Sequence, residues 1–255
     1  MLRFINLGSG SRGNASYLQC GEVGLLIDCG FSRRELFRRL AAVGIKRWQI
    51  GAILLTHEHT DHCQGIRLCA ADLGVPVMLT VGTARINGLD KKVSCRFIHP
   101  GIGFQVGGFE VFPLPVSHDA VEPCAYRIRA AGQTVALLTD LGTTACLPES
   151  ELRLLDHLYV EANYDEDLLR HSSYPDYLQK RIAGDRGHLS NEQCGILVAR
   201  LAAVSPRLQT VTLAHLSEKN NKADRALTTV RGLAAANFRV RWSVASQDQP
   251  TVIVS

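Results

Sequence analysis

Residues 56–62, with the sequence Thr-His-Glu-His-Thr-Asp-His, constrain this chain more than any other stretch. A short apolar run at 52–55 precedes them and indicates a buried strand. Apolar residues then recur at helical spacing from Ile66 to Leu73. Three imidazoles and an aspartate therefore lie in the turn between a strand and a helix, where they have little structural use. A polar, solvated loop is the alternative, and the density of the cluster argues against it.

The side chains in this turn are suited to metal binding. Neutral imidazole and carboxylate groups are ligands of zinc, manganese and iron. His57 and His59 alternate along extended backbone, so both rings can bind one metal ion. Asp61 and His62 fall where the turn begins to coil and can reach a second metal ion. The turn therefore predicts a site for two metal ions.

Three further ligand-type side chains follow predicted strands elsewhere in the chain. His118 and His215 each end a predicted strand, and Asp140 follows an apolar run and precedes Leu-Gly. Taken alone, each has an ordinary interpretation as a surface histidine or a turn-forming aspartate. Beside the cluster at 57–62, we expect His118 to be a third nitrogen for the first metal ion and Asp140 to bridge the two ions.

Predicted strands and helices occur along the whole chain of 255 residues, and its two halves have a similar rhythm. Strands are expected at 3–7, 16–20, 24–27, 52–55, 77–79, 97–100, 104–106, 109–116, 124–128, 134–138, 158–162, 209–214, 239–244 and 251–254. Helices are expected at 32–43, 66–73, 174–182, 191–203 and 224–235. This pattern predicts an α/β fold, an αβ/βα four-layer sandwich of two mixed β-sheets flanked by helices. No linker or repeat is visible, so we expect a single domain over 1–255.

Composition bounds the class of protein and its compartment. Hydrophobic residues make up 46% of the chain and charged residues 20%, which is typical of globular proteins. The formal charge of +4 is compatible with an anionic substrate but does not indicate one by itself. The eight cysteines form no C-x-x-C pair, so we expect reduced thiols. With no signal-peptide pattern and no long apolar run, we expect a cytoplasmic protein that does not enter a membrane.

A helix rich in arginine is predicted at 32–43, begun by a capping box of Ser32 and Glu35. Its arginines are expected to face outward, as a solvated helix face or, less simply, as a strip for a polyanion backbone. These arginines are Arg33, Arg34, Arg38 and Arg39. Just before this helix, Asp28 could support a metal ligand or cap the helix.

The motif at 56–62, followed at a distance by His118, Asp140 and His215, is similar to the ligand motifs of the metallo-β-lactamase superfamily. The resemblance covers essentially the whole chain and implies the fold of that superfamily. It implies these ligands: His57, His59 and His118 for the first metal ion, Asp61, His62 and His215 for the second, and Asp140 as the bridge.

Within the superfamily the chain most resembles the YycJ-type (WalJ) nucleases. The matching pieces are Ser-Gly-Ser-Arg-Gly-Asn at 9–14, Ser-His-Asp-Ala-Val-Glu-Pro at 117–123, Gly-His-Leu-Ser-Asn-Glu at 187–192 and Ala-His-Leu-Ser-Glu-Lys-Asn-Asn at 214–221. Tyr164 departs from the pattern, because a histidine is expected there in many relatives. The resemblance implies a DNA exonuclease, with single- or double-stranded DNA as its partner.

Roles for individual residues follow from this resemblance. His188 is similar to a histidine of the RNase Z branch that lies near the leaving group, so His188 and Asp61 are the expected catalytic residues. The alternative is that His188 takes the metal position given to His215. Expected contacts to substrate phosphates, by resemblance and donor chemistry, are Ser11, Asn14, Lys219 and Asn220.

The ligand set predicts phosphodiester chemistry. Two metal ions about 3.5–4 Å apart can share a hydroxide that attacks the phosphodiester and can hold both the attacking and the leaving oxygens. Nitrogen and oxygen ligands do not choose between Mn²⁺ and Zn²⁺. The alternative enzyme is a small-molecule phosphodiesterase, such as a phosphoribosyl 1,2-cyclic phosphate hydrolase. A thioesterase of the glyoxalase II type is a third, less favoured alternative. A non-enzymatic metal-binding scaffold is disfavoured, because all seven ligand positions are intact.

Several branches of the superfamily fit poorly. Dizinc β-lactamases have a cysteine at the position of Asp140, and flavodiiron oxygen reductases have a glutamate at the position of His59. The stretch between Asp140 and His188 is too short for the clamp domain of β-CASP ribonucleases, and no long arm of the RNase Z kind is evident.

Overall fold

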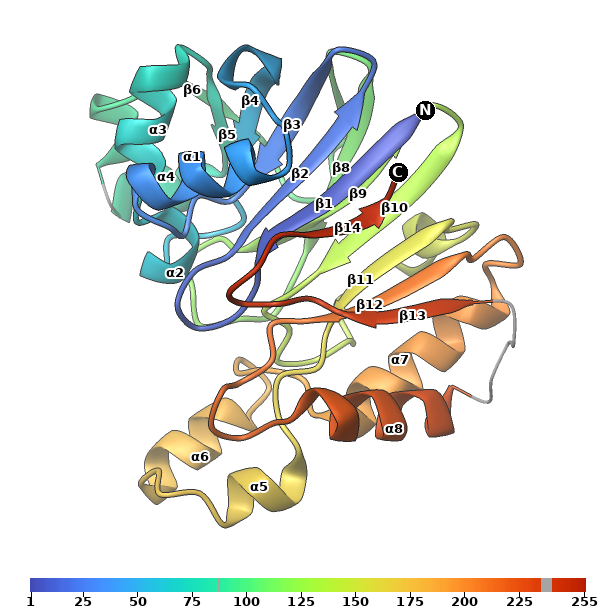
Figure 1. Ribbon diagram of the computed structural model, residues 1–255. Helices are drawn as coiled ribbons and strands as arrows, with labels where there is room; N and C mark the ends of the chain where they lie inside the picture. The colour runs from blue at the N-terminus through green and yellow to red at the C-terminus, as the bar shows by residue number, and fades with distance from the viewer. Residues whose placement is uncertain (87, 235–239) are drawn as a thin grey trace.

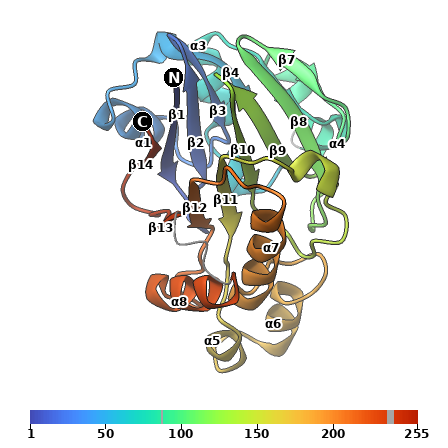
Figure 2. The ribbon, with the colours of Figure 1, turned by 90° about the vertical axis from the view of Figure 1, so that its right-hand side faces the viewer.

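The computed structural model describes residues 1–86, 88–234 and 240–255. Two seven-stranded mixed sheets face each other, and helices cover the outer face of each sheet (Figures 1 and 2). The α/β sandwich expected from the sequence is therefore confirmed. None of the described helices is long and apolar enough to cross a lipid bilayer.

The first sheet has the order β14-β1-β2-β3-β4-β5-β6. Its strands are β1 (Leu2–Gly8), β2 (Ala15–Cys20), β3 (Val23–Ile27), β4 (Ile50–Leu54), β5 (Val77–Leu79), β6 (Cys95–Phe97) and β14 (Thr251–Val254). Strands β14 to β3 pair antiparallel, and β3 to β6 pair parallel. Parallel neighbours need crossover connections. These contain α1 (Arg33–Ala42), η1 (Arg47–Gln49), α2 (Thr60–Cys63), α3 (Ile66–Leu73), α4 (Val81–Ile86) and η2 (Leu89–Lys91).

The second sheet has the order β13-β12-β11-β10-β9-β8-β7. Its strands are β7 (Phe104–Val106), β8 (Phe109–Pro115), β9 (Cys124–Ala130), β10 (Gln133–Leu138), β11 (His157–Glu161), β12 (Thr210–Ala214) and β13 (Arg241–Val244). Strands β10 to β13 pair parallel. The connections between them contain η3 (Glu149–Leu152), α5 (Glu166–Arg170), α6 (Asp176–Ile182), α7 (Asn191–Ala203) and α8 (Ala223–Leu233).

Three apolar clusters hold the four layers together. The inner cluster lies between the sheets, where Phe4 packs edge-on against Tyr159 with ring centroids 5.5 Å apart. Of the outer clusters, one joins α1 and α3 to the first sheet and the other joins α7 and α8 to the second. Strands buried on both faces need apolar side chains in both directions, which explains continuous runs such as Ile-Leu-Leu at 53–55.

Several expectations from the sequence need correction. The strand expected at 97–100 lies at Cys95–Phe97, and helices α4 and α5 were not anticipated. The last residue of the helix expected at 224–235 and the first of the strand expected at 239–244 lie outside the described residues. All eight cysteines are free thiols, as expected.

The prediction that all four arginines of the first helix face outward is wrong for Arg39. Its guanidinium group donates hydrogen bonds to the carbonyl oxygens of Leu7 (2.7 Å) and Gln247 (2.8 Å) and lies 4.0 Å from the ring centroid of Phe31. The Glu35 carboxylate accepts from Arg39 rather than completing the expected capping box. Arg39 therefore joins the helix to the first and last parts of the chain.

We predict that Arg39→Ala lowers the free energy of unfolding by about 3 kcal/mol, because two carbonyl oxygens and a carboxylate lose a buried charged donor. The matched control is Arg38→Ala, since Arg38 bonds the same Glu35 carboxylate but is exposed. Surface pairs of this kind contribute little. Urea unfolding of the metal-loaded protein measures both variants, and equal losses would contradict a special role for Arg39.

Candidate metal centre

The predicted ligand turn follows β4 and is held by two neighbouring loops. The backbone N–H of Asn14 donates to the carbonyl oxygen of Asp61, and that of Cys29 donates to His62, both at 2.7 Å. Gly30 packs so closely that an added Cβ would lie 1.7 Å from the carbonyl oxygen of Asp61. Only glycine permits this approach. The turn is therefore fixed by backbone contacts before any ligand binds.

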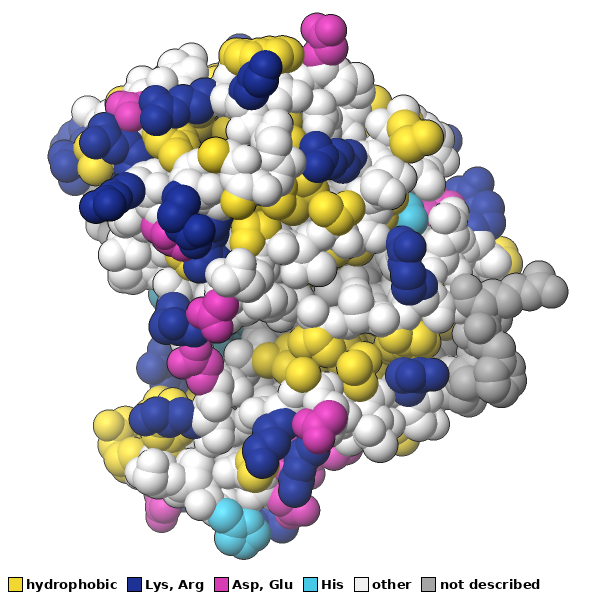
Figure 3. Space-filling view, viewed as in Figure 1, with side chains coloured by type: hydrophobic (Ala, Val, Ile, Leu, Met, Phe, Trp, Pro, Cys, Tyr) yellow, Lys and Arg dark blue, Asp and Glu magenta, His cyan; other side chains and the backbone are white. Residues whose placement is uncertain are grey.

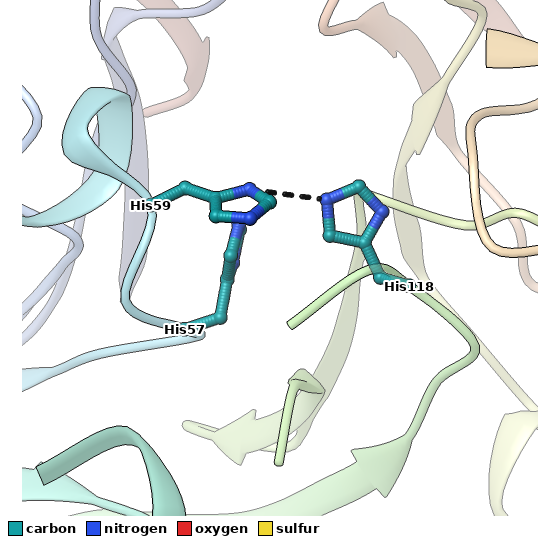
Figure 4. A group of neighbouring side chains, drawn as sticks. All are labelled: His57, His59 and His118. Carbon is teal, nitrogen blue, oxygen red and sulfur yellow. Dashed lines mark hydrogen bonds between the residues drawn. The ribbon is translucent and has the colours of Figure 1, made fainter. Parts of the chain in front are cut away.

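Three imidazoles form the first group of ligand-type side chains. The rings of His57, His59 and His118 face one another across a small space, and His59 Nδ1 lies 3.3 Å from His118 Nε2 (Figure 4). His118 Nδ1 donates to the carbonyl oxygen of Gly187 at 3.0 Å. Because a carbonyl can only accept, His118 Nε2 keeps its lone pair toward the group.

A second group consists of Asp61, His62 and His215, with ligand atoms within 4.8 Å of one another. Asp61 Oδ2 lies 3.4 Å from His62 Nε2 and 3.6 Å from His215 Nε2. The other nitrogen of His62, Nδ1, donates to Asp28 at 2.8 Å. Of the two roles left open for Asp28, the contact with His62 is the one observed, and Ser32 caps α1. Carboxylate–histidine pairs of this kind orient metal ligands.

Asp140 lies between the two groups. Its Oδ1 is 3.7 Å from His118 Nε2, and its Oδ2 is 3.4 Å from His62 Nε2. One oxygen of the carboxylate thus approaches each group, which is the arrangement that a bridging ligand needs. The seven side chains expected as ligands lie together at one edge of the sandwich, and their roles as ligands stay predictions.

The backbone at three of these positions is unusual. Asp28 and His215 directly follow strands, Asp140 lies two residues after β10, and the three have positive φ angles of 62°, 53° and 60°, in that order. Non-glycine residues seldom adopt this conformation, although aspartate and histidine do so more often than most. Such strain persists where surrounding contacts determine the conformation, and it is concentrated at functional sites.

Glu161, at the end of β11, is a site residue that the sequence reasoning missed. It is fully buried, and its Oε1 accepts hydrogen bonds from His188 Nδ1 and His215 Nδ1, both at 2.8 Å. Its Oε2 accepts from the backbone N–H groups of Leu141 and Leu189. Burial alone would raise the pKa of Glu161, but the two imidazoles lower it to about 2. One ionised carboxylate therefore orients two histidines.

A sequence signal for Glu161 was present. The run Leu-Tyr-Val-Glu-Ala at 158–162 places a glutamate inside an otherwise apolar strand. Glutamate is almost never fully buried unless it is paired. In the parallel register Glu161 lies beside Ala214, and His215 comes next in the chain.

The donor atoms of this site fit metal ions. Within the described residues, His57 Nε2, Asp140 Oδ2 and His215 Nε2 are buried and make no hydrogen bond. Such atoms are costly unless another partner satisfies them. Burial raises the pKa of Asp140, yet the neighbouring imidazoles hold it well below its ordinary value, so the carboxylate stays ionised. Burial and the surrounding imidazoles hold the pKa of His57 well below its ordinary value, which keeps it neutral, the form that binds metals.

The charges also match a pair of divalent cations. Five carboxylates contact the imidazoles of the site, and one of them, Asp119, is already paired with Arg181. The other four are buried or partly buried. They are Asp28, Asp61, Asp140 and Glu161. Burial lowers the pKa of His62 and His215, but the neighbouring carboxylates raise that of His62 well above its ordinary value and that of His215 to about 10, so protons balance part of this charge in the metal-free site. Metal binding would release such protons, and with neutral histidines two divalent ions would balance the four carboxylates. The His/Asp cluster can therefore bind metal ions.

A cavity of about 210 Å³ opens onto this cluster. Ser11, His188 and His215 are among the residues that line it. His188 is partly exposed and contacts Glu161 through Nδ1, whereas His215 is buried and directs Nε2 toward Asp61. This geometry favours His215 as the metal ligand and His188 as the residue near the leaving group, rather than the reverse.

The other expected phosphate contacts lie outside the cavity lining. Asn14 is buried, and its Nδ2 is 3.1 Å from Asp61 Oδ2, so it contacts a predicted ligand. Asn220 belongs to the loop that follows β12 and is fully buried, which argues against a phosphate contact. Lys219 is exposed, with its Nζ 5.1 Å from the ring centroid of Tyr174, which does line the cavity. Tyr164, the departure from the family pattern, is buried behind the site.

Comparison with known proteins identifies the family. A family model described as the Beta-lactamase superfamily domain matches residues 24–215. Exodeoxyribonuclease WalJ of Streptococcus pneumoniae is 33% identical over 241 residues, 92% of this chain and 89% of that protein. Exodeoxyribonuclease YycJ of Bacillus anthracis is 31% identical over 237 residues, 90% of this chain and 88% of that protein.

Solved structures give the fold. The crystal structure of the metallo-β-lactamase fold protein YhfI from Bacillus subtilis covers 98% of this chain and 99% of its own, with a TM-score of 0.75 and 17% identity. The chain is thus a hydrolase of the metallo-β-lactamase fold. It belongs to the β-lactamase superfamily and, within it, to the family of WalJ and YycJ.

Proposed function

We propose that the protein is a dinuclear-metal-dependent phosphodiesterase that acts as a DNA exonuclease. The observation that carries this proposal is the convergence of seven ligand-type side chains, three with buried and unpaired donor atoms and five of them lining one cavity. His57, His59 and His118 would hold the first ion, and Asp61, His62 and His215 the second, with Asp140 between them. Mn²⁺ and Zn²⁺ both suit this ligand set.

When bound, two such ions supply a water of lowered pKa and positive charge for the phosphate oxygens. The protein supplies the proton for the departing sugar oxygen. His188 suits this role because its Nδ1–H donates to Glu161, which orients the ring. The other ring nitrogen, Nε2, is then the one that can carry a proton to the sugar oxygen. His188 lines the cavity and is partly exposed, so a substrate can reach it.

DNA is the proposed substrate because relatives at 33% and 31% identity over nine-tenths of the chain are named exodeoxyribonucleases. Basic side chains near the cavity support an anionic strand. Arg181 lines the cavity, and Lys219 lies over the ring of Tyr174, which also lines the cavity. A strand held by such contacts loses affinity as salt rises.

End-labelled single- and double-stranded DNA, bis-p-nitrophenyl phosphate and a cyclic phosphate, each with Mn²⁺ and Zn²⁺ in turn, test the proposal. We expect stepwise loss of nucleotides from DNA ends. His59→Ala and Asp61→Ala should abolish this hydrolysis and lower metal content, because each removes a ligand. His99→Ala is the control, since His99 is exposed and outside the ligand groups. If the protein hydrolyses the cyclic phosphate and does not cleave DNA, the nuclease proposal is wrong and the small-molecule phosphodiesterase is favoured.

His188→Ala should leave the metal content unchanged while kcat on DNA falls by ~10²-fold or more, as for the loss of a general acid. Hydrolysis of bis-p-nitrophenyl phosphate should fall much less, because p-nitrophenolate departs without a proton. Loss of metal in this variant would mean that His188, rather than His215, is the ligand.

Glu161→Gln should weaken metal binding by roughly 10–100-fold, the usual effect of losing a group that orients a ligand. The amide also places N–H donors against the backbone N–H groups of Leu141 and Leu189. Metal titration of the purified variant measures the affinity, and the melting temperature of its metal-free form separates misfolding from loss of orientation. Unchanged affinity would limit Glu161 to a structural role.

A further inference from the structure

The segment between β11 and α7 forms a small lobe, α5 and α6, that projects beyond the two sheets (Figure 1). In the space-filling view the surface is hollowed between this lobe and the main body, on the left, and Lys and Arg side chains border the hollow (Figure 3). Tyr174, Arg181 and Ile182 of this lobe line the cavity together with candidate metal ligands. The lobe therefore supplies a wall of the site that the ligand motifs do not explain.

Tyr174 is held in place before any substrate binds. Its backbone N–H donates to Ser172 Oγ at 3.2 Å, and its carbonyl oxygen accepts from Gln179 Nε2 at 2.8 Å. Pro175 follows, and the residue before a proline is restricted to extended conformations. A half-buried aromatic ring on a fixed backbone loses little conformational freedom when it binds a flat partner.

One cationic group lies over this ring, and a second shares the cavity with it. Lys219, from the loop after β12, is exposed and has its Nζ 5.1 Å from the ring centroid. Arg181 is on α6, and its side chain is 62% exposed. It pairs with Asp119, whose Oδ1 lies 3.3 Å from His118 Nε2. An aromatic ring with an exposed lysine over it and an arginine in the same cavity suits a nucleotide, whose base displaces the lysine from the ring face while its phosphates bind the cations.

From this arrangement we propose that Tyr174 stacks on the base at an unpaired DNA end and that Lys219 binds a phosphate of the same strand. The inference rests on the proposed nuclease function and adds a substrate class to it. In a duplex the faces of interior bases are covered by their neighbours, so an unpaired end offers a free face.

Stacking of this kind tolerates every base, because each base has an aromatic face. The enzyme should therefore prefer unpaired ends without preferring a sequence. Tyr174 acts as a positioning residue: it aligns the terminal phosphodiester with the metal cluster and takes no part in proton transfer.

The test compares single-stranded oligonucleotides that end in a normal nucleotide or in an abasic one, with the metal-loaded protein. For the wild type we expect a lower KM on the normal end. Tyr174→Ala should raise this KM by roughly 5–150-fold, the range of base–aromatic stacking, and should make the two ends equivalent. Tyr174→Phe should behave as the wild type, because it keeps the ring.

Tyr177→Ala is the matched control, since Tyr177 is a tyrosine of the same lobe, on α6, that is 74% exposed and outside the cavity lining. We expect it to leave both KM values and the metal content unchanged. If Tyr174→Ala cleaves DNA and still distinguishes the normal end from the abasic one, the stacking inference is overturned while the nuclease function stands. If the wild type cleaves no DNA, both proposals fail.

Discussion

The site depends on buried carboxylates that are paired with imidazoles. An isolated ionised carboxylate is very costly to bury, so each one must find hydrogen-bond donors or cations. Glu161 meets this demand with two histidines and two backbone N–H groups, and Asp28 meets it with His62 and Thr56. These pairs fix which nitrogen of His62 and of His215 is free to bind a metal ion. The chemistry of the centre is therefore set by groups behind the predicted ligands.

The topology of the sheets brings these groups together. Parallel strands end at a common edge, and the loops that follow them carry functional side chains. Strands β3 and β4 of one sheet and β10 to β12 of the other are followed at this edge by Asp28, the histidine turn, Asp140 and His215. Because both faces of these strands are packed, the strand ends cannot shift independently.

Local patterns in the sequence predicted the fold and the seven ligand candidates, because a dense histidine turn and strand-end residues are visible over short distances. Features that depend on distant partners were missed. The sequence around Arg39 indicates a solvated helix face. In the structure its guanidinium group donates to the carbonyl oxygen of Gln247, which is distant in the sequence. Glu161 interrupts an apolar strand, and only the packing shows that His188 and His215 share it. Tyr174 had no local pattern, since its neighbour Lys219 comes from another loop.

The glycine-rich loop after β1 is completed by the last part of the chain. Ser9 donates from its backbone N–H to Ser246, and Gln247 Nε2 donates to the carbonyl oxygen of Gly13. The hydroxyl of Ser9 in turn accepts from the backbone N–H of His215. A nascent chain that has exposed the histidine turn thus still lacks the segment that closes this loop. Assembly of the centre during synthesis must therefore wait until Ser246 and Gln247 have left the ribosome.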